Sequence, residues 1–298
     1  ADIPVSFLTG AEDLNTKLDG FAAGAVDYIT KPYQSAEVLA RIQVHIRARK
    51  TARLLAASQM AQLDRLAHAQ KAILPSPNAI PSANFEVFYK PIHRAGGDFY
   101  DVLQVGEGIF DYVVADVCGH DADASLVTSA LKVLLHQGRS TLSSPMDTLR
   151  MVNTALRSAF PDHLYLTLVW ARLNRNRKVL TVLLAGHPPL LLLDHQSGVA
   201  EYLGASGDLL GSFDSIELEE IQHPVSQGDR LLLFTDGLIE MPMPGESPCR
   251  EDGLKRLQEA AHKRWIQPLP EQVHGIVTDL LADVGEVSDD LLLLGLEV

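Results

Sequence analysis

The sequence of 298 residues has only two cysteines and no long apolar run. Cys118 and Cys249 lie far apart, which excludes a disulfide framework and predicts a reducing cytoplasm as the compartment. Apolar stretches such as 190–193 fall far short of the roughly 18 residues that cross a bilayer, so we expect no membrane segment. A Gly-x-x-x-x-Gly-Lys loop is also absent, and P-loop ATP hydrolysis is therefore not supported.

Positive charge is scarce as well, with 25 Lys and Arg against 38 Asp and Glu. The net charge of −13 argues against an extended nucleic-acid surface, because phosphate binding requires clustered basic residues. Residues 1–40 and 72–298 are acidic, whereas 41–71 are basic, so we predict three segments. We interpret the basic stretch as a solvated helix face, with nucleic-acid contact as the alternative.

The first segment alternates short strands and helices. Residues 5–8 and 26–30 are apolar strands, 12–23 form a helix that ends at Gly24, and a second helix begins near Ser35. Strand–helix–strand units build parallel sheets, and two strands are too few to stand alone. We therefore expect half of an α/β domain.

The second helix has no stop signal, since no Gly or Pro occurs between Glu37 and Leu74. Its heptad-like positions are Ile42, Ile46, Arg49, Arg53, Ala56, Met60, Leu63, Ala67, Gln70 and Leu74. The helix either docks on a neighbouring domain or forms a two-stranded coiled coil. We favour a parallel homodimer through residues 36–74, because an isolated helix of this length needs a partner for its apolar face.

The third segment follows the prolines at 75, 77 and 81 and mixes strands with helices. Strands are expected at 85–89, 108–115, 164–173, 179–184, 230–234 and 291–296. Helices are expected near 123–137, 146–159, 252–263 and 269–284. This order favours a layered α+β domain.

Carboxylates follow or precede several of these strands. Asp98 begins a strand, Asp116 and Asp236 each follow one, and Asp289–Asp290 immediately precede the last. Any one of them could be a common turn former or helix N-cap. Together they would repel one another unless cations bound them, and oxygen-only ligands select Mg²⁺ or Mn²⁺. Without a cluster of cysteines and histidines, zinc is not expected.

The motifs around these carboxylates carry a resemblance. In order they are Gly96-Gly97-Asp98-Phe99-Tyr100-Asp101, Ala115-Asp116-Val117-Cys118-Gly119-His120, Ala185-Gly186-His187-Pro188-Pro189, Phe234-Thr235-Asp236-Gly237 and Ser288-Asp289-Asp290. The set resembles SpoIIE-type phosphatases, the bacterial branch of the metal-dependent (PPM, protein phosphatase 2C-like) Ser/Thr phosphatases. The match spans about 70–298. It implies a β-sandwich flanked by helices, with a two-metal site at one edge.

The resemblance also implies roles for single residues. Asp98 and Asp116 would share the two metals, the backbone carbonyl of Val117 would add a ligand, and Asp236 and Asp289 would complete the coordination of the second metal. Two Mg²⁺ or Mn²⁺ ions can lower the pKa of a water held between them, which then attacks phosphorus. The substrate class would be a phosphoserine or phosphothreonine protein.

Several residues beside these motifs have expected roles of their own. Asp121 stands where the family usually has glycine and would restrict the turn or add a charge beside the metals, and His120 beside it could support the metal ligands. We expect Cys118 to be a small buried residue and His187 to be a structural histidine. Arg94 either meets a phosphate or faces solvent.

Two further carboxylates adjoin the expected ligands. We expect Asp101 and Asp290 to orient ligands or waters, as polar groups behind metal ligands commonly do.

The first forty residues carry a second resemblance. Thr9 at a strand end, Tyr28, and Lys31 before Pro32 have the order and spacing of the C-terminal half of a response-regulator receiver domain. In that family the Thr and Lys contact the aspartyl phosphate, the aromatic residue is the switch partner of the Thr, and the Lys–Pro bond is often cis. The phosphoacceptor Asp is expected upstream of Ala1, so the sequence would be a fragment.

These observations predict an α+β chain with a partial α/β receiver domain (1–48), a long helical, coiled-coil linker (36–74) and a PPM-type β-sandwich flanked by α-helices (75–298). Its function would be phosphatase action on a protein partner, gated by receiver phosphorylation from a cognate histidine kinase. In this family the partner is often a STAS-type anti-sigma-factor antagonist. The alternative is a catalytically weak adaptor that binds a sigma or anti-sigma factor. A DNA-binding output is disfavoured, because the C-terminal segment is acidic and lacks a helix-turn-helix.

Overall fold

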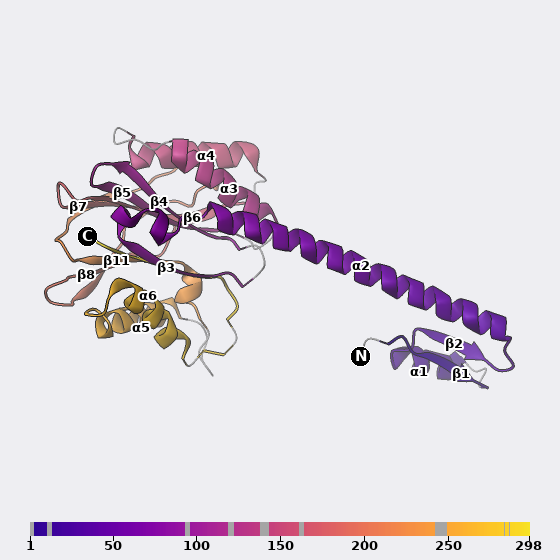
Figure 1. The fold of residues 1–298 in the computed structure, drawn as a ribbon. Helices are drawn as coiled ribbons and strands as arrows, with labels where there is room; N and C mark the ends of the chain where they lie inside the picture. Colours follow the sequence, from indigo (N-terminus) through magenta and orange to yellow (C-terminus); the bar gives the residue numbers. More distant parts are fainter. Residues whose placement is uncertain are drawn as a thin grey trace. The chain divides into compact units, whose positions relative to one another are not determined.

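The computed structural model describes residues 3–10, 14–92, 96–118, 122–137, 143–160, 164–241, 249–282, 284–285 and 287–298. The chain divides into two compact units, Ala1–Gln62 and Leu63–Val298, and each is described by itself (Figure 1). Among the described residues, no helix combines the length and apolar character needed to cross a lipid bilayer.

The first unit has the expected strand–helix–strand order. Its elements are β1 (Ser6–Thr9), α1 (Leu14–Ala22), β2 (Asp27–Thr30) and the start of α2 (Ser35–Ile73). The two strands are parallel, with Thr9 opposite Thr30, and the Lys31–Pro32 peptide bond is cis. Phe7 and Leu8 are each 40% exposed, because a two-stranded sheet with one helix covers little apolar surface.

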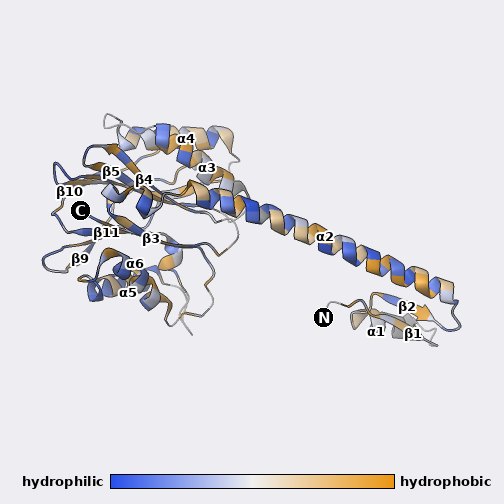
Figure 2. Ribbon diagram, viewed as in Figure 1, coloured by the Kyte–Doolittle hydropathy of each residue, from blue (hydrophilic) through white to orange (hydrophobic). Residues whose placement is uncertain are grey.

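Helix α2 is a single element of 39 residues, as its lack of Gly and Pro predicts. Figure 2 shows hydrophobic residues interspersed with hydrophilic ones along it. The exposed apolar side chains on α2 are Leu39, Ile42, Val44, Ile46, Leu54, Leu55 and Met60. Pairing of this surface with a second copy stays a prediction.

The second unit is a sandwich of two antiparallel sheets, each of five strands. One sheet has the order β10-β7-β6-β5-β4 and the other β3-β12-β11-β8-β9. The strands are β3 (Phe85–Lys90), β4 (Asp98–Gly106), β5 (Ile109–Val117), β6 (Leu166–Asn174), β7 (Val179–Ala185), β8 (Leu190–Leu193), β9 (Ala200–Leu203), β10 (Glu220–Pro224), β11 (Arg230–Phe234) and β12 (Leu291–Glu297). The helices are α3 (Ala122–Gln137), α4 (Pro145–Ala159), α5 (Arg250–Lys263) and α6 (Leu269–Leu281).

Strand periodicity divides the core of this unit into three layers. In β5, Tyr112 and Val114 face the other sheet, whereas Val113 and Ala115 face α3 and α4. In β12, Leu292, Leu294 and Leu296 face the other sheet, whereas Leu293 packs toward α5 and α6. Figure 1 shows the resulting order: α3 and α4, two sheets, then α5 and α6. The expected sandwich flanked by helices is therefore present.

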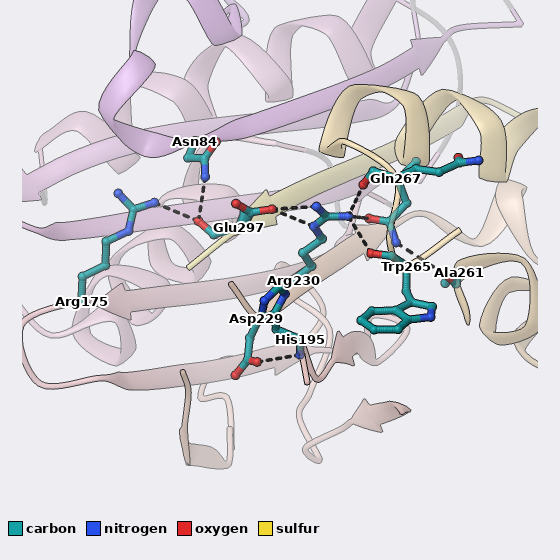
Figure 3. Close-up of polar contacts among 10 residues, drawn as sticks. Asn84, Arg175, His195, Asp229, Arg230, Ala261, Trp265, Gln267 and Glu297 are labelled. Carbon is teal, nitrogen blue, oxygen red and sulfur yellow. Dashed lines mark hydrogen bonds and ion pairs between the residues drawn. The ribbon is translucent and has the colours of Figure 1, made fainter. Parts of the chain in front are cut away.

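One end of the sandwich is held by a polar network, which we call the far end and define by Arg175, Asp229, Arg230 and Glu297 (Figure 3). Arg230 begins β11 opposite Glu297 of β12, and its Nε donates to Glu297 Oε2 at 2.8 Å. Its Nη1 donates to the carbonyl oxygens of Trp265 at 3.1 Å and Gln267 at 2.6 Å, in the segment between α5 and α6. Asp229 accepts from the amides of His195 at 2.9 Å and Ser226 at 2.7 Å, so hydrogen bonds to oriented backbone groups also hold this end.

Candidate active site

The end of the sandwich opposite the far end carries the predicted carboxylates, and we call it the carboxylate edge. Asp98, the first residue of β4, lies directly opposite Asp116 near the end of β5. Tyr100 and Val114, two residues along from each, belong to the layer between the sheets. Because side chains alternate along a strand, both carboxylates face the space between the two sheets.

The second sheet brings the other carboxylates to the same edge. Asp236 comes just after the end of β11, and Asp289–Asp290 come just before the start of β12, the neighbouring antiparallel strand. A Cβ added to Gly237 would lie 2.1 Å from the backbone oxygen of Asp290. This glycine therefore lets the two segments approach as closely as they do.

Side-chain contacts join the sheets at the carboxylate edge. The Thr235 hydroxyl donates to Asp98 Oδ2 at 2.7 Å. Asp290 accepts from the amides of Ile92 at 2.7 Å and Gly97 at 3.0 Å, so it holds the loop that carries Asp98. The contacts of Asp290 agree with the supporting role expected of it. Thr235 lies within a motif used for the resemblance, but sequence reasoning gave it no role.

The electrostatics of the edge are dominated by burial and mutual repulsion. Burial, with the neighbouring Asp116 charge next in importance, raises the pKa of Asp98 well above its usual range. Burial and the charges of Asp236, Asp289 and Asp290 raise the pKa of Asp116 to about 7. Asp236 has its pKa raised by burial and by Asp289, against a smaller opposing effect of Arg250.

This donor set fits a divalent cation by its chemistry. All the carboxylates supply hard oxygen ligands, and a cation would offset the repulsion that raises their pKa values. Within the described part of the chain, however, no three His, Cys, Asp or Glu side chains converge closely enough to hold one ion. The residues are gathered at one edge without forming a complete ligand shell, so metal binding by Asp98, Asp116, Val117, Asp236 and Asp289 stays a proposal.

Two expectations for neighbouring residues are wrong. Cys118 is exposed rather than buried, since it follows the last residue of β5. Asp101 does not support the metal ligands: strand alternation turns it toward α3, where Lys132 Nζ lies 2.6 Å and His136 Nε2 3.1 Å from its oxygens. Arg94, His120 and Asp121 lie outside the described residues.

Helix α2 and Tyr89, to which the sequence analysis assigned no role in the site, also contact the carboxylate edge. Gln70, near the end of α2, is buried and donates to the Gly96 carbonyl at 2.9 Å and to Thr128 Oγ1 at 3.0 Å. Tyr89 donates from its hydroxyl to the Asp98 carbonyl at 3.3 Å. The available signal for the first contact was a polar residue, Gln70, at a heptad-like position that would usually be apolar.

His187 is buried, as a structural histidine should be. Its Nδ1 lies 2.7 Å from Thr167 Oγ1, and its Nε2 lies 3.0 Å from the Phe234 carbonyl. Burial lowers the pKa of His187 to about 3, which keeps the ring neutral at physiological pH.

The expected receiver residues lie together in the first unit. The Lys31 amide donates to the Thr9 carbonyl at 2.7 Å. The ring of Tyr28 meets that of Phe7 edge-to-face, with 6.4 Å between centroids. Contact of Thr9 and Lys31 with an aspartyl phosphate stays a prediction.

Comparisons with curated proteins agree with both resemblances. Phosphoserine phosphatase RsbU of Bacillus subtilis is 26% identical over 195 residues, which are 64% of this chain and 56% of RsbU. The chain thus spans about half the length of this relative. Transcriptional regulatory protein YvrH of Bacillus subtilis is 49% identical over 47 residues, which are 16% of this chain and 20% of YvrH. The short match fits the receiver-like part.

Solved structures share the fold of the second unit. The SiaA-PP2C domain of Pseudomonas aeruginosa superposes with a TM-score of 0.71 at 24% identity, covering 82% of this chain and 98% of that domain. The catalytic domain of the serine/threonine phosphatase PstP, solved with two manganese ions, has a TM-score of 0.52 at 14% identity, covering 72% and 96%. The family model for stage II sporulation protein E (SpoIIE) matches residues 107–298. The match confirms the resemblance read from the motifs, and the chain belongs to the SpoIIE family.

Proposed function

We propose that this chain hydrolyses phosphoserine or phosphothreonine on a protein partner, with two divalent cations held at the carboxylate edge. The observation that carries the proposal is the gathering of Asp98, Asp116, Asp236 and Asp289 at one end of a SpoIIE-family sandwich. The name of RsbU, a phosphoserine phosphatase, supports the same reaction.

The proposed ligands are Asp98 and Asp116 from one sheet, Asp236 and Asp289 from the other, and the Val117 carbonyl. When bound, two divalent cations would lower the pKa of a water and neutralise charge on the phosphoryl oxygens. Mg²⁺ and Mn²⁺ suit this all-oxygen set. The manganese ions of PstP, a structural neighbour, are consistent with that choice.

The chain's own residues would prepare this site before substrate arrives. Thr235 restrains the Asp98 carboxylate, and Asp290 restrains the Gly97 amide beside it, so both limit the motion of the first proposed ligand. Arg250, at the start of α5, partly offsets the rise in the pKa of Asp236 that burial and Asp289 cause, and thus places positive charge near the edge. That charge would favour the approach of a phosphoryl group.

The partner we propose is a STAS-type anti-sigma-factor antagonist with a phosphorylated serine or threonine. The acidic balance of residues 72–298 would favour a partner with local positive surface around its docking site.

Regulation would act through α2. Gln70 of this helix binds both the Gly96 carbonyl, two residues before Asp98, and Thr128 of α3. A shift of α2 on receiver phosphorylation by a histidine kinase would therefore move the loop that carries Asp98. We expect a coupling of about 1–3 kcal/mol, or about 5–150-fold in rate.

Replacing Gln70 tests this coupling in the existing chain. Gln70→Leu should change turnover, whereas Gln62→Leu, an exposed position on the same helix, should not. In a form that carries the phosphoacceptor Asp, beryllofluoride should change the rate. Equal rates with equal metal affinity and KM would mean that the receiver does not gate catalysis.

The activity itself is tested by hydrolysis of p-nitrophenyl phosphate and of a phosphoserine protein with Mn²⁺. We expect turnover that EDTA abolishes and that added Mn²⁺ restores. Binding of a sigma or anti-sigma factor without such turnover would instead favour the adaptor.

A further inference from the structure

His187 connects the two sheets next to the carboxylate edge. It follows β7 of one sheet and precedes β8 of the other, and only 6% of its surface is exposed. A carbonyl oxygen can only accept a hydrogen bond, so Nε2 must carry the proton that it donates to Phe234. Nδ1 is then the acceptor for the hydroxyl of Thr167, 2.7 Å away.

Both partners of the imidazole adjoin proposed metal ligands. Thr167 of β6 lies directly opposite Asp116 of β5 in the sheet. Phe234 shares a peptide bond with Thr235, the residue whose hydroxyl holds Asp98, and Asp236 comes next. The rigid ring of His187 thus connects the strand beside Asp116 to the segment that carries Asp236.

The turn that carries His187 is itself fixed. Gly186 has a φ of +62°, which favours glycine, and its amide donates to the Gly207 carbonyl at 3.0 Å. A Cβ at this position would lie 2.3 Å from the Leu209 side chain. The ring therefore cannot follow independent movements of the two sheets without losing one of its hydrogen bonds.

We propose that His187, together with Thr167, is a positioning residue that sets the spacing between Asp116 on one sheet and Asp236 on the other. The inference rests on the proposed function, since the spacing matters when cations bind between these carboxylates. His187 touches neither substrate nor cation. Its effect is transmitted through the Thr167 hydroxyl and the Phe234 carbonyl.

Thr167→Val is the main test, because it removes the hydroxyl while keeping the side-chain shape. Thr167→Ser keeps the hydroxyl and should restore the behaviour of the natural chain. Tyr112→Phe is the matched control: it removes a buried hydroxyl that donates to the Ala83 carbonyl, four residues from Asp116 on the same strand. Mn²⁺ affinity is measured by titration calorimetry, and the melting temperature is measured in EDTA.

Thr167→Val should weaken Mn²⁺ binding by about 10-fold, the lower end of what partners behind metal ligands contribute. It should also lower kcat for p-nitrophenyl phosphate more than it raises KM. Tyr112→Phe should lower the melting temperature in EDTA but leave Mn²⁺ affinity unchanged. If Thr167→Val does not fold, His187→Gln replaces it as the test. The glutamine amide can still donate to the Phe234 carbonyl, but its oxygen does not take the place of Nδ1 as acceptor for Thr167. The same loss of affinity is therefore expected.

Natural Mn²⁺ affinity in Thr167→Val, or in His187→Gln, would overturn the inference while leaving the proposed function intact. An equal loss in Tyr112→Phe would also overturn it, because the effect would then be general destabilisation. Absence of Mn²⁺ binding in the natural chain would instead overturn the proposed function, and the inference with it.

Discussion

The two ends of the sandwich are built from the same strands but treat charge in opposite ways. At the far end, Arg230 and Glu297 face each other across β11 and β12 and are paired (Figure 3). At the carboxylate edge the same two strands lead to Asp236 and Asp289. Burial and the charge of Asp289 raise the pKa of Asp236, and burial and both charges raise the pKa of Asp116. A protein that pairs charges at one end and gathers like charges at the other is suited to bind a cation at the second.

The largest expected effect is that of Asp116→Asn. A neutral amide holds a cation less strongly than a carboxylate, so Mn²⁺-dependent turnover should fall by more than the roughly 10–100-fold that supporting residues contribute. In EDTA the same change should raise the melting temperature, because a repelled carboxylate is removed. Full Mn²⁺-dependent turnover in Asp116→Asn would show that the ligand assignment is wrong.

Gly237→Ala tests the close approach of the two segments at the edge. The added methyl group would lie 2.1 Å from the Asp290 backbone oxygen, so Asp289–Asp290 must move away. We expect Mn²⁺ affinity to fall by about 10–100-fold in calorimetry. Gly285→Ala is the control, since nothing lies within 4 Å of its added Cβ. Equal affinities in the two variants would mean that this approach does not matter for binding.

Arg230→Met tests the far end and should act on stability alone. The change leaves Glu297 and two carbonyl oxygens without their donor, so the free energy of unfolding in urea should fall by about 1–3 kcal/mol. Arg150→Met, at an exposed ion pair of 3.5 Å, should change it by less than about 0.5 kcal/mol. Loss of Mn²⁺ affinity in folded Arg230→Met would contradict the separation of the two ends.

The smallest expected effect is an opposite pH dependence of stability at Asp116 of the carboxylate edge and at Asp279 of α6, which is paired with Arg264 at 2.7 Å. The pKa of Asp116 is raised to about 7, so in EDTA its contribution favours folding below about pH 4 and is lost as the pH rises to 7. The pKa of Asp279 is lowered to about 2 by Arg264, so its contribution is present above about pH 4 and is lost as the pH falls toward 2.

Melting temperatures across this pH range check both signs. The advantage of Asp116→Asn over the natural chain should grow from pH 4 to pH 7, and the deficit of Asp279→Asn should shrink below pH 4. A constant difference in either variant would contradict the corresponding pKa shift.

Much of this architecture could be predicted from local pattern. Helix α2 was predictable because no Gly or Pro interrupts it, and the inner strands because their apolar runs end at turn residues. Strands β8, β9 and β10 were missed, because β8 and β9 have only 4 residues each and β10 is a polar edge strand that pairs with β7 alone. Pairing across a sheet edge depends on distant residues, which local pattern does not reveal.

The site was predictable only in part for the same reason. The carboxylates could be found because each stands where a strand begins or ends. The roles of Thr235 and Gln70 depend on contacts with Asp98, Gly96 and Thr128, which are distant in sequence. Asp101 was misassigned because its strand position, one pleat out of phase with Asp98, turns it toward α3.

Titration calorimetry of the natural chain with MnCl₂ tests the central claim most directly. The account predicts saturable binding of two ions per chain, with binding reduced in Asp116→Asn and unchanged in Arg230→Met. A flat titration of the natural, folded chain, or natural binding by Asp116→Asn, would contradict it.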